Sequence, residues 1–353
     1  MAGPRDLDTA GPEGKLAPDG PPVVSFASND YLGLTQHPGV VAAARAALDR
    51  WGTGSGAARL VVGSRPVHSE LEAELAAWKR SERAVLFPTG FAANLGVITT
   101  MGGPGTLVCS DELNHASIVD GCRLARGEVA VYRHADPDHV EHLLAGRGAR
   151  RALVVTDSVF SMDGDLAPLE DLAERCARHD ALLVLDEAHA VLEVGPDLDG
   201  VTVLRVGTLS KTLGSLGGFV AGPAPLADLV VNRARSYIFT TAPTPADTAA
   251  ALAALRVVRS PEGEGLVHRL RRHVDVLRPG HPSPIVPVVC GDEARALAAA
   301  AALLDRGLLV PAIRPPTVPP GTSRLRVTLS AAHTEEQVAR LAAALDELPG
   351  IEP

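Results

Sequence analysis

Short apolar runs alternate with helix-like stretches along the chain, from about residue 40 to about residue 220. The runs are apolar on both faces, which is typical of strands that helices cover on each side. Ala- and Leu-rich stretches such as Ser69–Ala77 and Leu169–His179 separate them. This alternation predicts an α/β fold with a mostly parallel central sheet and crossover helices on both faces. The predicted strands span residues 84–87, 106–109, 129–132, 152–156, 181–185, 202–206 and 218–221.

The pattern changes after residue 221. Helix-like stretches follow at 226–234, 245–258 and 264–277, and the tail mixes predicted strands (285–290, 308–311, 325–329) with predicted helices (293–306, 335–348). The segment TTAPTPAD, residues 240–247, interrupts the pattern with two prolines. We therefore expect an N-terminal arm over residues 1–39, a large domain over 40–243 and a smaller C-terminal α+β domain over 244–353.

Composition narrows the classes of function. The net charge of −9 over 353 residues does not favour nucleic acid as the main partner, because phosphate binding requires an excess of Lys and Arg. Charges, prolines or glycines interrupt the longest apolar stretches, so no membrane span is expected. The first residues, MAGPRDLDTAGPEGKLAPDGPP, lack the apolar segment of a secretory signal, and their composition predicts a poorly ordered arm.

The four cysteines lie far apart in the sequence and show no CxxC spacing. This pattern favours buried thiols in a reduced, cytoplasmic protein over a metal site. The cysteines are Cys109, Cys122, Cys176 and Cys290.

Lys211 stands among small residues in TLSKTLGSLGG, with no other charged residue within five positions. Burial lowers the pKa of an ammonium group and makes it usable as a nucleophile and a base. About 25 residues earlier, LLVLDEAHA ends a predicted strand with Asp186 and His189. This combination is the arrangement that holds pyridoxal phosphate, with the lysine on the aldehyde and the aspartate at the pyridine nitrogen. Turn capping by Asp186, a structural His189 and an exposed lysine remain alternatives.

Two segments could hold a phosphate group. FPTGFAANLG, residues 87–96, follows a predicted strand and opens a helix, whose first backbone N–H groups bind phosphate well. The hydroxyls of Thr208 and Ser210 could add donors, although a turn without a ligand is equally allowed. GTGSGAAR, residues 52–59, lacks the preceding strand and the final glycine spacing of a dinucleotide fingerprint, so it does not predict NAD.

Further candidates lie in loops. His115, in DELNHASIVDG, could stack on an aromatic cofactor or only satisfy its loop, and Ser161 follows a predicted strand in VFSMDGD. Arg314, Arg324 and Arg326 flank a Pro-rich loop. Arginine suits bidentate carboxylate binding, and simple solvation is the alternative for at least one of the three.

Eight motifs occur together in a fixed order from about Val24 to the C-terminus. They are SNDYLGL, GSGAARLVVGSRPVHSELE, PTGFAAN, NHASIVDG, VFSMDGD, LDEAH, TLSKTLGS and RPPTVPPGTSRLRVTLSAAHT. Together they resemble the α-oxoamine synthase family of fold-type I pyridoxal-phosphate (PLP) enzymes. The resemblance implies a homodimer with the site at the subunit interface.

The resemblance also implies a role for each matching residue. Lys211 matches the Schiff-base lysine, Asp186 the partner of the pyridine nitrogen and His189 the donor to the ring hydroxyl. His115 matches the residue stacked on the ring, and Ser161 a serine near it. Phosphate contacts are implied for Gly90, Phe91 and Thr208, and for Thr240 and Thr241 of the partner chain. Substrate contacts are implied for Asn29, Thr317 and Arg326, with Arg326 on the amino-acid carboxylate.

The implied reaction is the decarboxylative condensation of an amino acid with an acyl thioester. Within the family, RPPTVPPGTSRLR and SAAHT are most similar to the branch that joins L-alanine to a pimeloyl thioester, carried by coenzyme A or acyl carrier protein, in biotin synthesis. A relative that uses glycine or serine, and a non-catalytic partner subunit, are the alternatives. The chain departs from the family in its short N-terminal arm and in a shortened stretch between Ala190 and Thr208.

Overall fold

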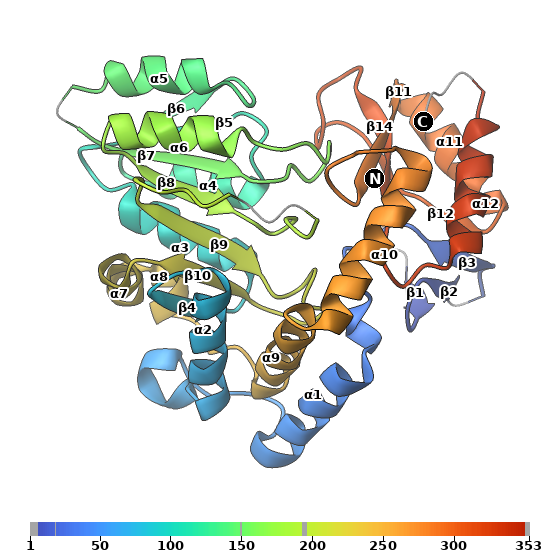
Figure 1. The fold of residues 1–353 in the computed structure, drawn as a ribbon, viewed down its shortest axis with the longest axis horizontal. Coiled ribbons are helices and arrows are strands. Elements are labelled where there is room, and N and C mark those ends of the chain that lie inside the picture. The colour runs from blue at the N-terminus through green and yellow to red at the C-terminus, as the bar shows by residue number, and fades with distance from the viewer. Residues whose placement is uncertain (1–5, 18, 149, 193–195, 350–353) are drawn as a thin grey trace.

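A seven-stranded sheet forms the centre of the computed structural model, which describes residues 6–17, 19–148, 150–192 and 196–349 (Figure 1). Its strand order is β4-β10-β9-β8-β7-β5-β6. All neighbours pair in parallel except β10, which is antiparallel to both β4 and β9. The strands are β4 (Arg83–Phe87), β5 (Thr106–Asp111), β6 (Glu128–Tyr132), β7 (Arg151–Asp157), β8 (Leu182–Asp186), β9 (Val203–Thr208) and β10 (Gly218–Gly222). The predicted, mostly parallel sheet is therefore confirmed.

Helices cover both faces of this sheet. On one face, Val97 of α3 and Ile118 of α4 pack with Val155 and Val184 of the sheet. On the other, Leu172 of α6 packs with strand residues that point the opposite way. The helices up to residue 258 are α1 (Pro38–Trp51), α2 (Pro66–Trp78), α3 (Gly90–Met101), α4 (Ala116–Leu124), α5 (Pro137–Ala145), α6 (Leu169–Arg178), α7 (Ala224–Arg233), α8 (Arg235–Ile238) and α9 (Pro245–Val258), with a 3₁₀ turn η1 (Leu34–Gln36) and a π-helical turn η2 (Arg59–Gly63).

Helix α6 illustrates how the sequence selects its buried face. Its buried residues Leu169, Leu172, Ala173 and Cys176 recur at the spacing of one helical stripe. Charged residues fill the remaining positions except Ala177. This amphipathic pattern places α6 on the sheet and its charged side toward solvent.

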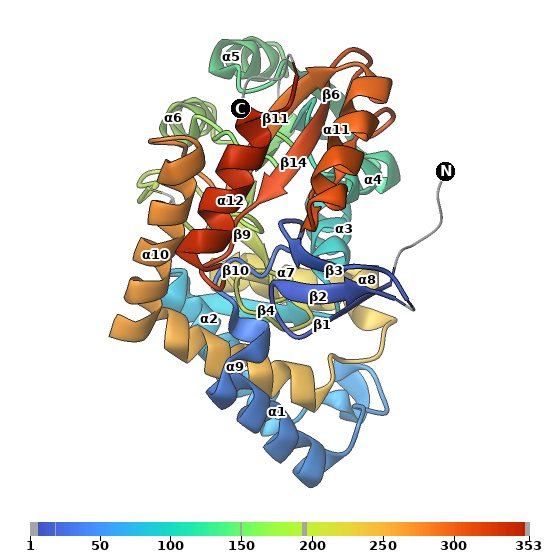
Figure 2. The same cartoon turned by 90° about the vertical axis from the view of Figure 1, so that its right-hand side faces the viewer.

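A second, three-stranded sheet of order β11-β14-β13 lies beside the first, at the right of Figure 1. Both of its pairings are antiparallel. Helices α11 and α12 pack with it, as Figure 2 shows from the side. Its elements and neighbours are α10 (Pro261–Leu277), β11 (Ile285–Gly291), α11 (Glu293–Asp305), β12 (Leu308–Leu309), β13 (Ala312–Ile313), β14 (Ser323–Thr328) and α12 (Glu335–Asp346).

The N-terminal segment folds with the C-terminal part of the chain. Strands β1 (Leu7–Thr9), β2 (Glu13–Leu16) and β3 (Pro22–Ser25) join β12 in a four-stranded sheet. Strand β3 pairs in parallel with β12, and Phe26 is fully buried beside His333. The prediction of a poorly ordered arm is therefore wrong for the described residues 6–17 and 19–25. Composition missed this pairing because the partner strand lies almost 300 residues away. The boundaries expected at residues 39 and 243 stay predictions.

Within the described residues, no helix is both long enough and apolar enough to cross a membrane.

Candidate active site

The carboxyl ends of three neighbouring parallel strands carry polar residues. Asp157 ends β7, Asp186 ends β8 and Thr208 ends β9. Asp157 and Asp186 are register partners across the β7–β8 pair. Ligand groups collect at this edge of open α/β sheets, because the strand ends leave room outside the sheet. The position predicted for Asp186 thus falls where a ligand site is expected.

Helix α3 holds the Asp186 carboxylate in place. Asn94 Nδ2 donates to Asp186 Oδ2 at 2.6 Å, and the Ala188 amide donates to Oδ1 at 2.9 Å. Asp186 is buried, and Asn94 also donates to Ser117 Oγ at 2.9 Å. One oxygen of the Asp186 carboxylate therefore faces α3, and the carboxylate stays at the end of β8.

Lys211 lies in a compact turn that follows β9. The Leu209 amide donates to the Gly217 carbonyl, and the Gly214 amide to the Lys211 carbonyl, each at 2.9 Å. Gly214 has φ 57°, and a Cβ there would lie 2.6 Å from the Thr35 nitrogen, so glycine is required. Burial lowers the pKa of Lys211, while the nearby Asp186 and Asp157 act in the opposite direction. The amine is thus closer to its neutral form than an exposed lysine would be.

Two histidines flank Lys211 and are held neutral. Burial lowers the pKa of His189 well below its usual value, and the charges of Lys211 and Arg326 act in the same direction. His115 is exposed overall, but partial burial of its ring lowers its pKa; the charge of Asp186 opposes this shift and that of Lys211 adds to it. His115 Nδ1 accepts from the Ser117 amide at 3.2 Å, so its neutral ring carries the proton on Nε2. The imidazole of His115 can therefore donate one hydrogen bond to a ligand.

Asp157 is a member of this cluster that sequence reasoning missed. Its Oδ2 accepts from the His115 amide at 2.7 Å, which fixes the start of α4. Burial and then the neighbouring Asp186 raise the pKa of Asp157 well above its usual value. The same signal that marked Asp186, an aspartate at the end of an apolar strand, could have found it. Tyr31 was missed as well, although it lies within SNDYLGL and its hydroxyl hydrogen-bonds with His189 Nδ1.

Arg326 comes from β14 and faces the strand-end cluster. Its Nε donates to the Ser161 carbonyl at 2.6 Å, and one Nη donates to Asn29 Oδ1 at 3.2 Å. The other Nη donates to Thr328 Oγ1 at 3.0 Å. Arg326 is 6% exposed, and burial lowers its pKa. The predicted site residues Asn29, Ser161 and Arg326 thus lie together.

The start of α3 and the end of β9 form a cradle. Thr89 caps α3 by accepting from the Ala92 amide at 3.0 Å, which leaves the Gly90 and Phe91 amides at the helix start. A Cβ on Gly218 would lie 2.5 Å from the Gly90 nitrogen, and one on Gly90 would lie 3.3 Å from Thr208 Cβ. Thr208 and Ser210 hydroxyls are 2.7 Å apart beside it. Glycine at both positions therefore brings amides and hydroxyls close enough to hold an anion.

Three predicted residues lie in exposed or loop positions outside the contacts of the cluster. Thr241 and Thr317 are exposed, and Thr240 is half-buried in the loop after α8. The neighbouring Ala242 amide donates to the Ala57 carbonyl, and the Thr317 amide donates to the Arg314 carbonyl within a turn. The predicted roles of these threonines stay predictions. Of the other two arginines at the Pro-rich loop, Arg324 pairs with Asp163 and Arg314 lies 3.7 Å from Glu293.

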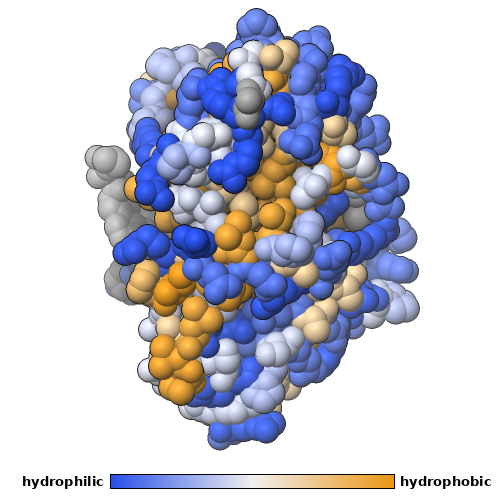
Figure 3. Space-filling view, turned by 90° about the vertical axis from the view of Figure 1, so that its left-hand side faces the viewer, coloured by the Kyte–Doolittle hydropathy of each residue, from blue (hydrophilic) through white to orange (hydrophobic). Residues whose placement is uncertain are grey.

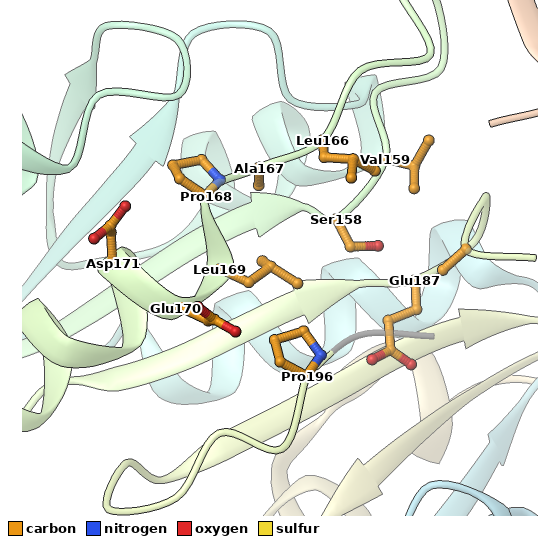
Figure 4. Close-up of a pocket in the computed structure, with 11 residues that line it drawn as sticks. Ser158, Val159, Leu166, Ala167, Pro168, Leu169, Glu170, Asp171, Glu187 and Pro196 are labelled. Carbon is orange, nitrogen blue, oxygen red and sulfur yellow. The ribbon is translucent and has the colours of Figure 1, made fainter. Parts of the chain in front are cut away.

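A separate pocket of about 340 Å³ lies beside the same strand ends (Figure 4). Ser158 and Glu187, which directly follow Asp157 and Asp186, line it together with the start of α6. Successive residues of a strand point to opposite faces, so this pocket lies across the sheet edge from the cluster. A larger cavity of about 970 Å³ beside Trp78 and Arg205 is also lined by Glu187, Ala190 and Thr212, the sequence neighbours of Asp186, His189 and Lys211. Neither cavity is lined by a predicted site residue.

The chain belongs to the aminotransferase class I and II family, whose model matches residues 21–345. Its fold is that of the fold-type I PLP enzymes, and it uses pyridoxal 5′-phosphate. The chain is 52% identical to a protein of Anaeromyxobacter sp. (strain K) named 8-amino-7-oxononanoate synthase, over 99% of this chain and 94% of that one. It is 48% identical to a protein of the same name from Methylobacterium sp. (strain 4-46), over 97% and 94% of the two chains. The predicted family resemblance is confirmed.

Solved structures show the same fold. A serine palmitoyltransferase of S. paucimobilis, solved with bound PLP and myriocin, superposes with a TM-score of 0.91 at 31% identity, covering 96% of this chain and 91% of that chain. The Sphingomonas wittichii serine palmitoyltransferase gives a TM-score of 0.87 at 32% identity, covering 94% and 88%.

The residues present fit PLP. The cradle of Gly90 and Thr208 suits a phosphate dianion, and the buried Asp186 carboxylate suits a protonated pyridine nitrogen. Lys211, with its lowered pKa, supplies the amine that the cofactor's aldehyde requires.

Proposed function

We propose that this chain condenses L-alanine with a pimeloyl thioester to form 8-amino-7-oxononanoate, a step of biotin biosynthesis. Carbon dioxide and the free thiol of the carrier are released, which balances the reaction. The observation that carries the proposal is that Lys211 follows the end of β9, the strand beside the one that Asp186 ends, and that the opposite charges of Asp186 and Arg326 both act on its amine. The name shared by relatives at 48–52% identity supports the choice of product.

Bound PLP would supply an electron sink for the carbanion that forms at the amino-acid Cα. Asp186 would keep the pyridine nitrogen protonated, since Asn94 and the Ala188 amide fix its carboxylate at the strand end. Lys211 would hold the cofactor and then accept the Cα proton, because burial lowers its pKa toward the range of a useful base. These two roles require the Asp186 and Lys211 side chains to stay close together.

The remaining residues would bind and orient. His189 would donate to the ring hydroxyl, and its ring is fixed by Tyr31. His115 would stack on the ring, and its backbone is anchored by Asp157. Arg326 would bind the amino-acid carboxylate, Asn29 and Thr317 would lie near the substrate, and Ser161 would lie near the cofactor ring. The cradle of Gly90, Phe91 and Thr208 would hold the phosphate.

We include a homodimer in the proposal because apolar side chains are exposed on η2 and at Phe239, which directly precedes Thr240. Leu60, Val61 and Val62 of η2 are 54–72% exposed, and Phe239 after α8 is 69% exposed. Turn η2 contacts α8. Figure 3, which views the molecule from the left-hand side of Figure 1, shows hydrophobic surface in its lower part. An apolar patch of this kind is typical of a protein interface. A partner seated there would bring its Thr240 and Thr241 toward the phosphate. A cytoplasmic location stays a prediction.

A competing amino acid deserves a direct test, because serine palmitoyltransferases share the fold at 31–32% identity. Purified protein with PLP is mixed with pimeloyl-CoA or pimeloyl-acyl carrier protein and with L-alanine, glycine or L-serine in turn. Product masses and the cofactor absorbance are recorded for each pair. We expect 8-amino-7-oxononanoate with L-alanine. Product from glycine or L-serine alone would reject L-alanine as the substrate. No absorbance change with any amino acid would reject the proposed PLP-dependent condensation.

A further inference from the structure

His134 lies outside the strand-end cluster and bridges two carboxylates. Its Nδ1 is 3.1 Å from Asp111 Oδ1, and its Nε2 is 2.7 Å from Asp165 Oδ2. An imidazole can donate on both sides only when both nitrogens carry protons. The two carboxylates raise the pKa of His134 to about 10. His134 is therefore a cation that joins two parts of the chain.

The Asp111 side of this bridge is rigid. Asp111 ends β5, and its side chain is almost fully buried. Its carboxylate also accepts from the Leu113 and Ala135 amides, each at 2.9 Å. The ring of His134 packs edge-on against Phe160, with centroids 4.4 Å apart. The imidazole is thus held by the sheet and points toward the loop that follows β7.

The Asp165 side belongs to the loop Phe160–Asp165, which contacts the three-stranded sheet. The Phe160 amide donates to the Asp165 carbonyl at 3.0 Å, which closes the loop. Gly164 lies against β11, and a Cβ there would be 2.1 Å from the Ile285 carbonyl oxygen. Ser161 offers its carbonyl to Arg326 Nε at 2.6 Å. A shift of this loop would therefore move the acceptor that orients Arg326.

We propose that the His134–Asp165 ion pair locks the loop Phe160–Asp165 and thereby positions Arg326 for the carboxylate of the amino-acid substrate. His134 is then a positioning residue, because it acts through Ser161 and does not touch the substrate. The inference rests on the proposed function, in which Arg326 binds that carboxylate. It assigns to HADPDHV, the segment after β6, a role that the sequence motifs did not suggest.

The test compares His134→Gln and Asp165→Asn with the wild-type protein and with His142→Gln, whose histidine is exposed on α5. The two test variants break the same ion pair from opposite sides, so a folding defect in one leaves the other informative. Hydrogen–deuterium exchange is measured for the peptide that covers Phe160–Asp165. We expect this peptide to exchange faster than in the wild-type protein in both test variants, and at the wild-type rate in His142→Gln. Unchanged exchange in both would overturn the lock.

The second readout is the affinity of the PLP-loaded protein for L-alanine and for L-alaninol, which lacks the carboxylate, followed by cofactor absorbance. We expect the preference for L-alanine over L-alaninol to fall about tenfold in both test variants, because a misplaced binding group weakens only its own contact. Equal loss for both amines would reject the link to Arg326. A wild-type protein that responds to neither amine contradicts the proposed function instead, and the exchange measurement still tests the lock.

Discussion

The two sheets bring charges to the site in different ways. At the strand ends of the seven-stranded sheet, Asp157 and Asp186 are buried near the partly buried Lys211; burial shifts the pKa of Asp157 and of Lys211, and the charge of Asp186 acts on both. On β14 of the three-stranded sheet, Arg326 donates to three neutral oxygens, of Ser161, Asn29 and Thr328. Burying a cation with only neutral partners is costly. The charged groups at the strand ends thus compensate one another, whereas the positive charge of Arg326 on β14 would be compensated by a bound anionic ligand.

Arg324, two residues before Arg326, makes the contrast sharper. Both arginines lie on the same strand and are 5–6% exposed. Arg324 pairs with the Asp163 carboxylate, whereas the acceptors of Arg326 are uncharged. The difference in partners separates a structural arginine from a candidate binding arginine, which the sequence alone could not do.

Replacing the amine at the strand ends should have the largest effect. We expect Lys211→Ala to lower turnover by about 10⁴-fold, the upper end of what a general acid or base contributes, while PLP still binds in the cradle. Steady-state product formation and the cofactor content of the dialysed protein check this. Lys15→Ala, at an exposed position of β2, is the control. Normal turnover of Lys211→Ala would remove the strand-end cluster from the reaction.

The two neighbouring aspartates should differ. Asp186→Asn should reduce turnover by about 100-fold, because the variant lacks the carboxylate that would keep the pyridine nitrogen protonated. An opposite charge close to such a group shifts its pKa by one to three units. Asp157→Asn should cost only a few-fold, since burial and the neighbouring Asp186 raise the pKa of Asp157 and favour its neutral form, which asparagine imitates in shape. Turnover of both variants at neutral pH is the measurement. Equal losses would show that the two carboxyls act as one charged unit.

The two arginines of β14 should also differ. Arg326→Ala should raise KM for L-alanine by about 10- to 100-fold, the value of a charge-assisted hydrogen bond of about 1.5–3 kcal/mol. Its effect on kcat should be smaller. Arg324→Ala, which removes a pairing with Asp163 in the loop that carries the Ser161 carbonyl, should raise KM by no more than about tenfold, because the guanidinium of Arg326 itself remains. Initial rates over a range of L-alanine concentrations check both. A larger KM change in Arg324→Ala would reverse the assignment.

The smallest expected effect concerns stability and pH. The pKa of His134 is raised to about 10 from 6.5, so its ion pairs stabilise the fold fully below about pH 6.5 and are lost as the pH rises toward 10. The stability difference between wild type and His134→Gln should therefore shrink over that range. Urea unfolding of both proteins at the two ends of the range measures it. A difference that stays constant would mean that His134 is not the charged partner.

The sequence predicted the elements whose signal is local. Strand β7, with the apolar run ALVVT, and helix α6, with its single apolar stripe, were both found within a few residues of their observed ends. The antiparallel direction of β10 and the pairing of β3 with β12 could not be predicted, because both depend on contacts between distant segments. The hydrophobic pattern of a segment indicates that it forms a strand, but it does not indicate which strand it pairs with.

The site divides in the same way. Lys211 and Asp186 were found because their residue types are unusual in apolar surroundings. Asp157, Tyr31 and His134 were missed because their meaning comes from partners far along the chain. The predicted site therefore lacked residues that hold the groups proposed to touch the cofactor ring.

The most direct measurement is reductive trapping of the cofactor. The chain contains three lysines, Lys15, Lys79 and Lys211, of which Lys15 is exposed and Lys79 pairs with Glu187 at 2.7 Å. The PLP-loaded protein is reduced with borohydride, digested and mapped by mass spectrometry. We predict loss of the visible absorbance band and one phosphopyridoxyl group, on Lys211. Label on Lys15 or Lys79, or no label, would contradict the assignment of the strand-end cluster as the active site.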